Sequence, residues 1–435
     1  MSSDGNINEF GGTEAGLRLP NWAPRELTGN YFDEVQKRAG IDIPFLLLTL
    51  LILMIGVIMV LSASFASAYY SMGQPTWFFI RQFVFAVSGV AIMLLTSRVR
   101  ISTMSRWSMH LLLAALALLV AVLVIGISVN GAKRWIGIGT GGGAFTFQPS
   151  EIAKVAVVMA YAQMMCKFGN KMKTFKYGVL PFVLITGVIV LLLYRQPHLS
   201  ASIIVLAITA IMMFAGGTRL RYFVLALLIA ALAAGAVLYP HLRAQAADEA
   251  VQEISVKSAV LEASGNLGYA GRRVGAWLDP DADPLGDGFQ IRQSLIAVGA
   301  GGMFGQGLGQ SRQKYLYLPE EHNDYIFAIV SEELGFIGAM LILMLFMLLI
   351  IRGFWLALHA RDKYAKSITI GIVSLLAIQV VLNVAVVLNL APATGISLPF
   401  FSYGGTALWI QLLQMGIILA VSREIPREPK AGNGN

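Results

Sequence analysis

The stretch IPFLLLTLLILMIGVIMVL, residues 43–61, contains no charged side chain and sets the character of the whole chain. At a rise of about 1.5 Å per residue, a helix of this length approaches the roughly 30 Å thickness of a bilayer's hydrocarbon core. The stretch therefore predicts a membrane-spanning helix. It does not read as part of a cleavable signal peptide, because residues 1–40 before it are polar and carry both charge signs.

Nine further runs share this apolar composition. Of the 435 residues, 57% are hydrophobic and only 13% are charged, which is about half the charged fraction of an average soluble domain. The mean hydropathy is +0.70. These values exclude a water-soluble globule and predict an all-α polytopic integral membrane protein with ten transmembrane helices. The nine further spans are expected near residues 78–96, 108–128, 151–166, 177–194, 199–216, 222–239, 324–351, 367–390 and 404–421.

Lysine and arginine accumulate in alternate gaps between these spans, which predicts the orientation of the chain. Basic residues precede the first span, follow the even-numbered spans and follow the last one, so both termini are predicted to be cytoplasmic. Lys133 and Arg134 lie in an outside gap and depart from this rule, which favours a functional role for them. The formal net charge of +8 is thus explained by membrane insertion, and no nucleic-acid partner is expected.

The predicted organisation is one membrane domain with polar ends. Residues 1–40 are expected to form a disordered cytoplasmic tail, 41–422 the ten-helix domain, and 423–435 a second cytoplasmic tail. Within the domain, residues 240–323 are predicted to form a large extracellular loop between the seventh and eighth spans. Loops of this length are usually functional or disordered. Because this loop mixes apolar residues with glycines, we expect it to pack on the outer face of the bundle as short or re-entrant helices.

Three familiar ligand patterns are excluded by the sequence. Cys166 is the only cysteine, which excludes an intramolecular disulfide and a cysteine-based metal cluster. The segment DPDADP carries alternating acids, yet Pro284 stands where a calcium loop requires glycine. Gly305, Gly307 and Gly309 do not follow a strand of a βαβ unit, so they predict no dinucleotide-binding fold.

Polar residues cluster in NGAKRWIGIG and FQPSEIAKVAV, within residues 130–157, around the outer end of the fourth span. Glu151 and Lys154 are three positions apart, so on a helix they share one face and can neutralise each other. One interpretation is an interfacial ion pair that only tunes depth or packing. The alternative is a polar site that also includes Arg134 and Trp135.

A second cluster lies in LPEEHNDYIFAIVSEELGFIG, residues 318–338, where the large loop enters the eighth span. Asp324 is either a helix cap, because carboxylates complement the helix dipole there, or a chemical group. Glu332 and Glu333 lie two turns deeper, where carboxylates are rare and usually face a cavity or a partner. For these two glutamates we expect a structural pairing with an arginine or lysine of the bundle.

Taken together, these motifs resemble the SEDS family (shape, elongation, division and sporulation), which includes FtsW, RodA and SpoVE. The motifs KRW, FQPSEIAK, DPLGDGFQIRQS, LPEEHNDYIFA with EELG, and LPFFSYGG occur in the family's order between residues 43 and 422. Members have ten transmembrane helices and a large outside loop between helices 7 and 8. Each of the segments RQPHLSAS and LPFFSYGGTAL, taken alone, could be an ordinary turn between helices. Only together with the other motifs do they indicate the family.

The resemblance implies a peptidoglycan glycosyltransferase that polymerises lipid II into glycan strands at the outer face of a bacterial cytoplasmic membrane. It also implies a divalent cation, Mg²⁺ or Mn²⁺, a class B penicillin-binding protein as partner, and a place in the division or sporulation machinery. Asp324 matches the family's essential aspartate, so it is the expected general base and a candidate metal ligand. The residues expected to bind substrate are Arg134, Trp135, Glu151, Lys154, Arg195, Gln293, Ser294, His322 and Ser402.

Two positions depart from the family's pattern. The family usually has aspartate where this chain has His198, and commonly threonine where it has Asn323. A role for an acid at position 198 is therefore not carried over to this chain. The long N-terminal tail and the LPFFSYGG ending favour the FtsW and SpoVE side of the family.

Two other functions stay open from the sequence. A lipid II flippase or another lipid transporter would place polar groups through the full depth of the bilayer, whereas the charged candidates above gather at one predicted face. A non-catalytic scaffold for a penicillin-binding protein would need no carboxylate at position 324. The clustering at one face favours an interfacial enzyme.

Overall fold

The computed structural model describes residues 40–129, 132–138, 145–247, 260, 268–281, 286 and 288–425. Within this part, residues 40–425 belong to one compact unit. The predictions for the two terminal tails, and for several parts of the large loop, lie outside the described residues.

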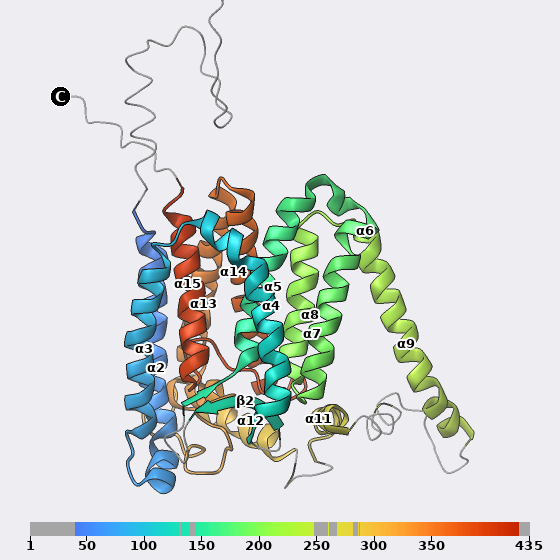
Figure 1. The fold of residues 1–435 in the computed structure, drawn as a ribbon. Helices are drawn as coiled ribbons and strands as arrows, with labels where there is room; N and C mark the ends of the chain where they lie inside the picture. The colour runs from blue at the N-terminus through green and yellow to red at the C-terminus, as the bar shows by residue number, and fades with distance from the viewer. Residues whose placement is uncertain are drawn as a thin grey trace, which may run out of the picture. The chain divides into compact units, whose positions relative to one another are not determined.

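Helices make up most of the described chain, and each predicted span falls on one of them (Figure 1). The helices are α2 (Ile43–Met72), α3 (Trp77–Thr96), α4 (Ile101–Ile125), α5 (Pro149–Phe168), α6 (Phe175–Gly178), α7 (Leu180–Arg195), α8 (Leu199–Ala215), α9 (Leu220–Ala247), α11 (Gly268–Leu278), α12 (Phe289–Gly301), α13 (Ile326–His359), α14 (Lys363–Val387) and α15 (Gly405–Ser422), with a short 3₁₀ helix η1 (Gly169–Lys173).

Within the described residues, eight helices are long and apolar enough to cross a membrane, and two shorter apolar helices, Leu199–Ala215 and Leu220–Ala236, accompany them. The helical, multi-pass membrane architecture is thereby confirmed. The count of ten spans stays a prediction, as does the side of the membrane on which each end lies.

The first described helix, α2, runs well past the predicted end at Leu61 because residues 62–72 contain neither glycine nor proline. Its start is capped by the Asp42 carboxylate, which accepts a hydrogen bond from the Phe45 N–H at 3.0 Å. The same carboxylate receives two hydrogen bonds from Arg352 of α13, at 3.1 and 2.6 Å. The cap therefore also ties α2 to the far end of α13.

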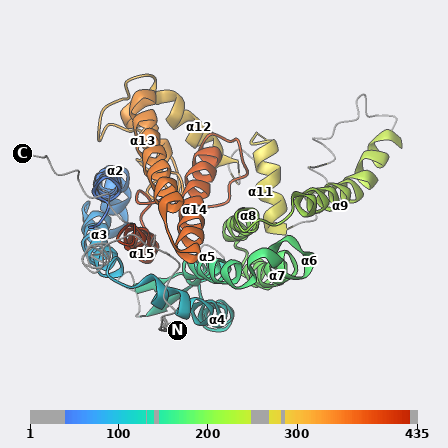
Figure 2. The ribbon, with the colours of Figure 1, turned by 90° about the horizontal axis from the view of Figure 1, so that it is seen from above.

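Three helices, α5, α14 and α15, are the most enclosed of the eight long ones. Between 61% and 72% of their most apolar segment is buried, against 22% for α3. Seen along the helices, α9 lies at the rim (Figure 2), and large apolar side chains such as Leu227 and Leu232 are exposed on it. The interior between these helices can therefore hold polar side chains that lipid would not solvate, such as Gln379 and Asn383 of α14.

A small antiparallel sheet, which the all-α prediction missed, follows α4. Its strands are β1 (Ile127–Val129), β2 (Ala132–Ile138) and β3 (Phe145–Phe147), in the order β1-β2-β3. Gly137 pairs with Thr146 across β2 and β3. β1 and β3 have only three residues each, and the seven residues of β2, AKRWIGI, do not alternate strictly between apolar and polar, so the pattern gave little signal. The correction concerns this connection only.

The glycine-rich part of the large loop packs closely on α13. A Cβ atom on Gly301 of α12 would overlap the Ser331 carbonyl, and one on Gly335 would overlap the Gly305 backbone nitrogen. Gly335 interrupts α13 with a φ of +69°, and the Phe336 N–H donates to the Gly302 carbonyl at 2.8 Å. Only glycine allows this conformation and this approach of two backbones without strain. The expectation of short helices in the loop is confirmed by α11 and α12.

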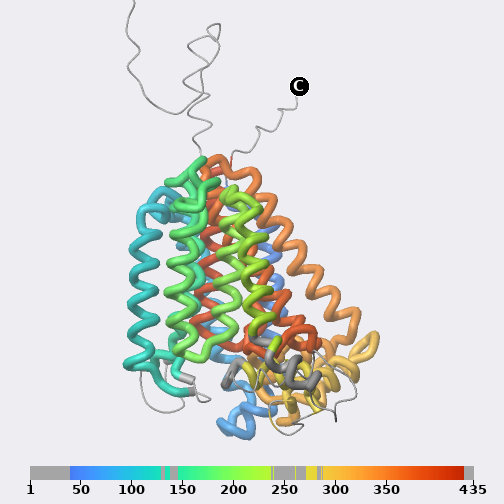
Figure 3. Tube along the Cα trace, turned by 90° about the vertical axis from the view of Figure 1, so that its right-hand side faces the viewer, coloured from blue at the N-terminus to red at the C-terminus, as the bar shows by residue number. Residues whose placement is uncertain are grey.

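The small sheet, α11 and α12 lie at the same end of the bundle (Figures 1 and 3). The start of α2 and the end of α15 lie at the opposite end. Loops that approach from different parts of the chain therefore meet at one end, where α5, α8 and α13 begin.

Candidate active site

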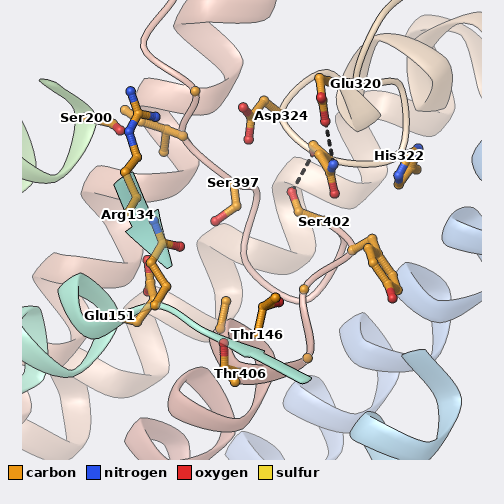
Figure 4. A pocket seen from close by; sticks show the side chains of 18 of the residues that line it. Arg134, Thr146, Glu151, Ser200, Glu320, His322, Asp324, Ser397, Ser402 and Thr406 are labelled. Carbon is orange, nitrogen blue, oxygen red and sulfur yellow. Dashed lines mark hydrogen bonds between the residues drawn. The ribbon is translucent and has the colours of Figure 1, made fainter. Parts of the chain in front are cut away.

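A large cavity of about 1320 Å³ opens among these converging loops and helix starts. Its lining comes from the end of α2, from α3, β2 and β3, from the starts of α5, α8, α12 and α15, from α11 and α14, and from the segments before α13 and α15. Figure 4 shows Asp324, Glu320 and His322 on one side of it, and Arg134, Ser200 and Glu151 on the other. Acidic and basic side chains thus face the same space from separate elements.

The turn that carries Asp324 is held in place through its backbone. The Asn383 amide nitrogen of α14 donates to the Asp324 carbonyl at 2.8 Å and to the Ile396 carbonyl at 2.7 Å. The Ser402 hydroxyl donates to the Asn323 carbonyl, also at 2.8 Å. These contacts tie the turn to the segment before α15, so the position of Asp324 is fixed without the use of its own carboxylate.

The Asp324 carboxylate itself lines the cavity and, among the described residues, receives no hydrogen bond. Its Oδ2 atom lies beside Gly395, where a Cβ atom would stand only 2.9 Å away. Burial and the neighbouring Glu320 raise the pKa of Asp324 to about 6, although Arg134, Arg273 and His322 act in the opposite direction. A carboxylate with this pKa is still ionised at neutral pH and is a better proton acceptor than an exposed one.

Glu151 and Lys154, on the first turns of α5, form the ion pair that their spacing predicted, with Nζ 2.8 Å from Oε1. Both side chains are nearly buried and both line the cavity. Because each charge neutralises the other, the pair can stand in a poorly hydrated wall.

Arg134 and Trp135, on β2, also line the cavity. The Arg134 guanidinium donates to the Gln196 carbonyl, with an Nε to oxygen distance of 3.3 Å, and to the Pro197 carbonyl. It therefore joins the sheet to the turn between α7 and α8. The departure of Arg134 from the positive-inside pattern is consistent with this placement.

An aromatic wall surrounds His322. Its ring centroid lies 4.5 Å from that of Phe78 on α3 and 5.8 Å from that of Tyr403. The Tyr403 N–H donates to the His322 carbonyl at 2.8 Å, and His322 Nδ1 lies 3.3 Å from a Glu321 carboxylate oxygen. This wall offers flat apolar faces next to the charged side of the cavity.

Seven of the ten predicted site residues line the cavity, and three do not. Arg195 is exposed at the end of α7, and Gln293 lies on α12 outside the lining. Ser294 is buried, and its hydroxyl donates to the Val387 carbonyl of α14 at 2.9 Å. On α12 it is Gln290 that reaches the cavity, because Ser294 faces α14 one turn later.

Other lining residues were not singled out by the sequence. Arg81 on α3 and Arg273 on α11 add positive charge, and each was one basic residue among many. His198 and Ser200 lie in the segment RQPHLSAS, whose motif was noticed without a role for these two side chains. The signal that could have found them is the position of polar residues at the start of a span.

Glu332 and Glu333 do not line the cavity and are fully partnered. Glu333 Oε1 lies 2.9 Å from the Lys314 ammonium, and the Ser62 hydroxyl donates to the same carboxylate. This confirms the predicted pairing for Glu333. For Glu332 the prediction of a basic partner was wrong, because its carboxylate accepts from the Ser311 hydroxyl and, at 2.9 Å, from the Arg312 N–H.

Comparison with known proteins gives the family. The chain matches the family described as “Cell cycle protein”, the FtsW, RodA and SpoVE group, over residues 43–426. It is 41% identical over 389 residues to “Stage V sporulation protein E” of Bacillus subtilis (strain 168), covering 89% of this chain and 98% of that protein. It is 38% identical over 396 residues to “Probable peptidoglycan glycosyltransferase FtsW” of Trichlorobacter lovleyi, covering 91% of this chain and 96% of that protein.

The fold is also similar to solved structures. One is described as “Structural coordination of polymerization and crosslinking by a peptidoglycan synthase complex”, with a TM-score of 0.69 and 27% identity, covering 89% of this chain and 99% of that one. The rod shape determining protein RodA of Thermus thermophilus gives a TM-score of 0.60 at 24% identity, covering 89% of this chain and 98% of that one, which shows the fold alone. The chain therefore belongs to the FtsW, RodA and SpoVE family of cell cycle proteins, as its motifs predicted.

Proposed function

We propose that this protein polymerises lipid II into glycan strands, with Asp324 as the general base. The observation that carries the proposal is the Asp324 carboxylate, which lines a large cavity, is held through its backbone and receives no hydrogen bond from the described residues. Its pKa of about 6 suits a group that must be ionised and still accept a proton. The predicted topology places the cavity at the outer face of the cytoplasmic membrane.

The proposed reaction is a transfer with inversion. The 4-hydroxyl of the acceptor attacks the anomeric carbon of the donor, its proton passes to the Asp324 carboxylate, and the bond from the anomeric carbon to the diphosphate oxygen breaks. The lipid diphosphate leaves with the electron pair, and the α linkage of the donor becomes β. One carboxylate is sufficient for this reaction, because no covalent intermediate has to be formed and then resolved.

The leaving diphosphate requires positive charge, and the cavity wall supplies it. Arg134 and Arg273 both lower the pKa of Asp324, so they act within the same electrostatic environment as the base. Lys154 adds a cation whose charge is offset by Glu151. These groups orient and stabilise the departing anion.

A divalent cation fits the site only with help from the substrate. No group of three or more histidine, cysteine, aspartate or glutamate residues that could hold a metal occurs among the described residues. Mg²⁺ is usually held by one or two carboxylates together with substrate phosphates, and Asp324 with Glu320 could provide those carboxylates. When bound, such an ion would add positive charge at the diphosphate.

The relatives support the same proposal. The Trichlorobacter lovleyi protein is named as a peptidoglycan glycosyltransferase, and the solved structure with the TM-score of 0.69 is of a peptidoglycan synthase complex. We therefore extend the proposal to a class B penicillin-binding protein as partner, ten spans and cytoplasmic termini. The similarity to the sporulation protein and to FtsW favours division or sporulation as the setting.

The test is polymerisation by the purified protein with its partner in proteoliposomes that contain fluorescent lipid II. Glycan strands of many disaccharides support the proposal. Transfer of labelled lipid II between the leaflets without polymer would instead support a flippase. Polymer that forms at the same rate with and without this chain would identify it as a scaffold.

A further inference from the structure

The start of α8 presents two buried polar atoms that have no hydrogen-bond partner among the described residues. They are the His198 Nδ1 atom and the Ser200 hydroxyl, and the described part of the chain supplies neither with a hydrogen bond, although the two residues are only 6% and 3% exposed. Both residues line the cavity. Buried polar groups are satisfied in the great majority of cases, so an unsatisfied pair at a cavity points to a ligand.

The protonation state of His198 makes its Nδ1 atom a hydrogen-bond donor, and the Ser200 hydroxyl can donate as well. Burial, Arg134 and Lys154 lower the pKa of His198 well below its usual range, so the ring is neutral at neutral pH. The Gln148 amide nitrogen lies 3.4 Å from Nε2, and an amide N–H in this position makes Nε2 the acceptor. The ring proton then lies on Nδ1, and the Ser200 hydroxyl follows two positions later on the first turn of α8.

The surrounding backbone and charges favour an anion. α8 is 17 residues long and has no side-chain cap at His198, so its first N–H groups are left for another acceptor. α5, whose Gln148 also gives no cap, begins on the same side of the cavity. Helix starts carry partial positive charge. Arg134 adds a full positive charge. The charge of Lys154 is offset by Glu151.

We propose that the start of α8, with His198 and Ser200, is the subsite for the diphosphate of a polyprenyl-linked sugar donor. Phosphate oxygens only accept hydrogen bonds, so they match the His198 Nδ1–H, the Ser200 hydroxyl as a donor and the first N–H groups of α8. The assignment rests on the proposed function, because it names the part of the donor that this wall binds. Arg134 affects both His198 and Asp324, so the subsite and the base act on one bound substrate from opposite sides.

The chain offers a matched control for the key contact. Ser150 and Ser200 both occupy the second position of a helix, in α5 and α8, and both carry a buried hydroxyl to which the described residues offer no partner. Ser200 lines the cavity and Ser150 does not. A general effect of losing a buried hydroxyl will therefore appear in both alanine variants, whereas a ligand contact will appear only in Ser200→Ala.

The experiment measures equilibrium binding to the full-length protein in detergent, followed by tryptophan fluorescence because Trp135 lines the cavity. The probes are undecaprenyl pyrophosphate, undecaprenol and inorganic pyrophosphate. We expect His198→Phe and Ser200→Ala each to raise the Kd for undecaprenyl pyrophosphate by about tenfold, the effect of one lost hydrogen bond to a charged oxygen. His198→Asn, which keeps a donor, should stay within about threefold of wild type, and Ser150→Ala should be unchanged.

Three results would overturn the subsite. They are unchanged binding in His198→Phe and Ser200→Ala, an equal loss in Ser150→Ala, and the same losses with undecaprenol, which has no phosphate. Inorganic pyrophosphate that binds as tightly as the lipid would reassign the site to a free anion.

Polymerisation of lipid II by wild-type protein is measured in parallel. If polymer forms but the variants have unchanged Kd values, the subsite assignment is wrong and the proposed function stands. If no polymer forms but binding depends on His198, the proposed polymerase function is wrong and the diphosphate subsite is supported.

Discussion

Two sets of carboxylates flank the start of α13, and they differ in what surrounds them. Glu333 is paired with Lys314 and receives a hydrogen bond from Ser62, and its side chain is fully buried. Asp324, two turns earlier in the chain, receives no hydrogen bond from the described residues and faces a cavity. Both are acids near the start of α13, so residue type alone does not separate a structural role from a chemical one. The partners do.

The comparison also explains why the two sets occur together. The Glu332 and Glu333 carboxylates bind the segment that contains Ser311 and Lys314, and this segment leads directly to the turn at Asp324. A saturated network therefore anchors one side of the turn, while Asn383 and Ser402 anchor the other. The carboxylate between these anchors is left for substrate.

The largest effect is expected for Asp324→Asn. The asparagine keeps the size of the side chain but cannot take the acceptor's proton, so the polymerisation rate should fall by about 10² to 10⁴. The measurement is the initial rate with fluorescent lipid II, together with the unfolding temperature, which should be unchanged. Asp362→Asn, at the capping residue of α14, is the control, since asparagine also caps. Loss of folding in Asp324→Asn would show that Asp324 has a structural role, like Glu332 and Glu333.

The second prediction concerns Glu333, for which we expect a loss of stability rather than a direct loss of the reaction rate. Glu333→Gln leaves the Lys314 charge buried without a counter-charge, so the protein should lose about 3–5 kcal/mol of stability. The unfolding temperature in detergent measures this. Asp281→Asn is the control, because the Asp281–Arg292 pair is exposed and such pairs contribute about 1 kcal/mol or less. A Glu333→Gln protein that is stable and folded but inactive would show that Glu333 acts in the reaction.

The third prediction concerns the Glu151–Lys154 pair, which shares features of both sets because it is paired and lines the cavity. Glu151→Ala and Lys154→Ala should each impair polymerisation, since each leaves an uncompensated charge. The double variant should be much better than the sum of the two losses. The double-mutant cycle on the polymerisation rate measures this coupling, and additive losses would show two independent roles.

A smaller effect is expected from Gly395→Ala. Gly395 has a φ of +70°, and its added methyl group would press on Oδ2 of Asp324 and shift the base, so the rate should fall by about tenfold. Gly73→Ala is the matched control, because Gly73 has the same φ and no atom within 4 Å of the added carbon. Equal losses of activity in both variants would attribute the effect to backbone strain.

The helices of this fold could be predicted because each apolar run is long and few charges interrupt it. The sheet β1-β2-β3 could not, since β1 and β3 are very short and β2 does not alternate strictly between apolar and polar residues. The interruption of α13 at Gly335 was hidden as well, because it depends on the approach of Gly305 from another segment. Contacts between distant parts of the chain decide both features.

The site was predicted unevenly for a similar reason. Glu151 with Lys154 followed from helical spacing, and Asp324 from its motif. Ser294 and Gln293 share a motif with Gln290, but only Gln290 faces the cavity, because the rotation of α12 against α14 selects the face. The unpartnered state of His198 Nδ1 could not be read from sequence at all, since it depends on every neighbour of the ring.

The most direct test of the central claim is the pH dependence of the single-turnover polymerisation rate. If the ionised Asp324 carboxylate is the base, the rate should rise with pH through a midpoint near 6 and level off above it. Glu320 raises the pKa of Asp324 and Arg134 lowers it, so Glu320→Gln should move the midpoint to lower pH and Arg134→Gln to higher pH. A midpoint that stays in place in both variants would contradict the assignment of Asp324 as the base.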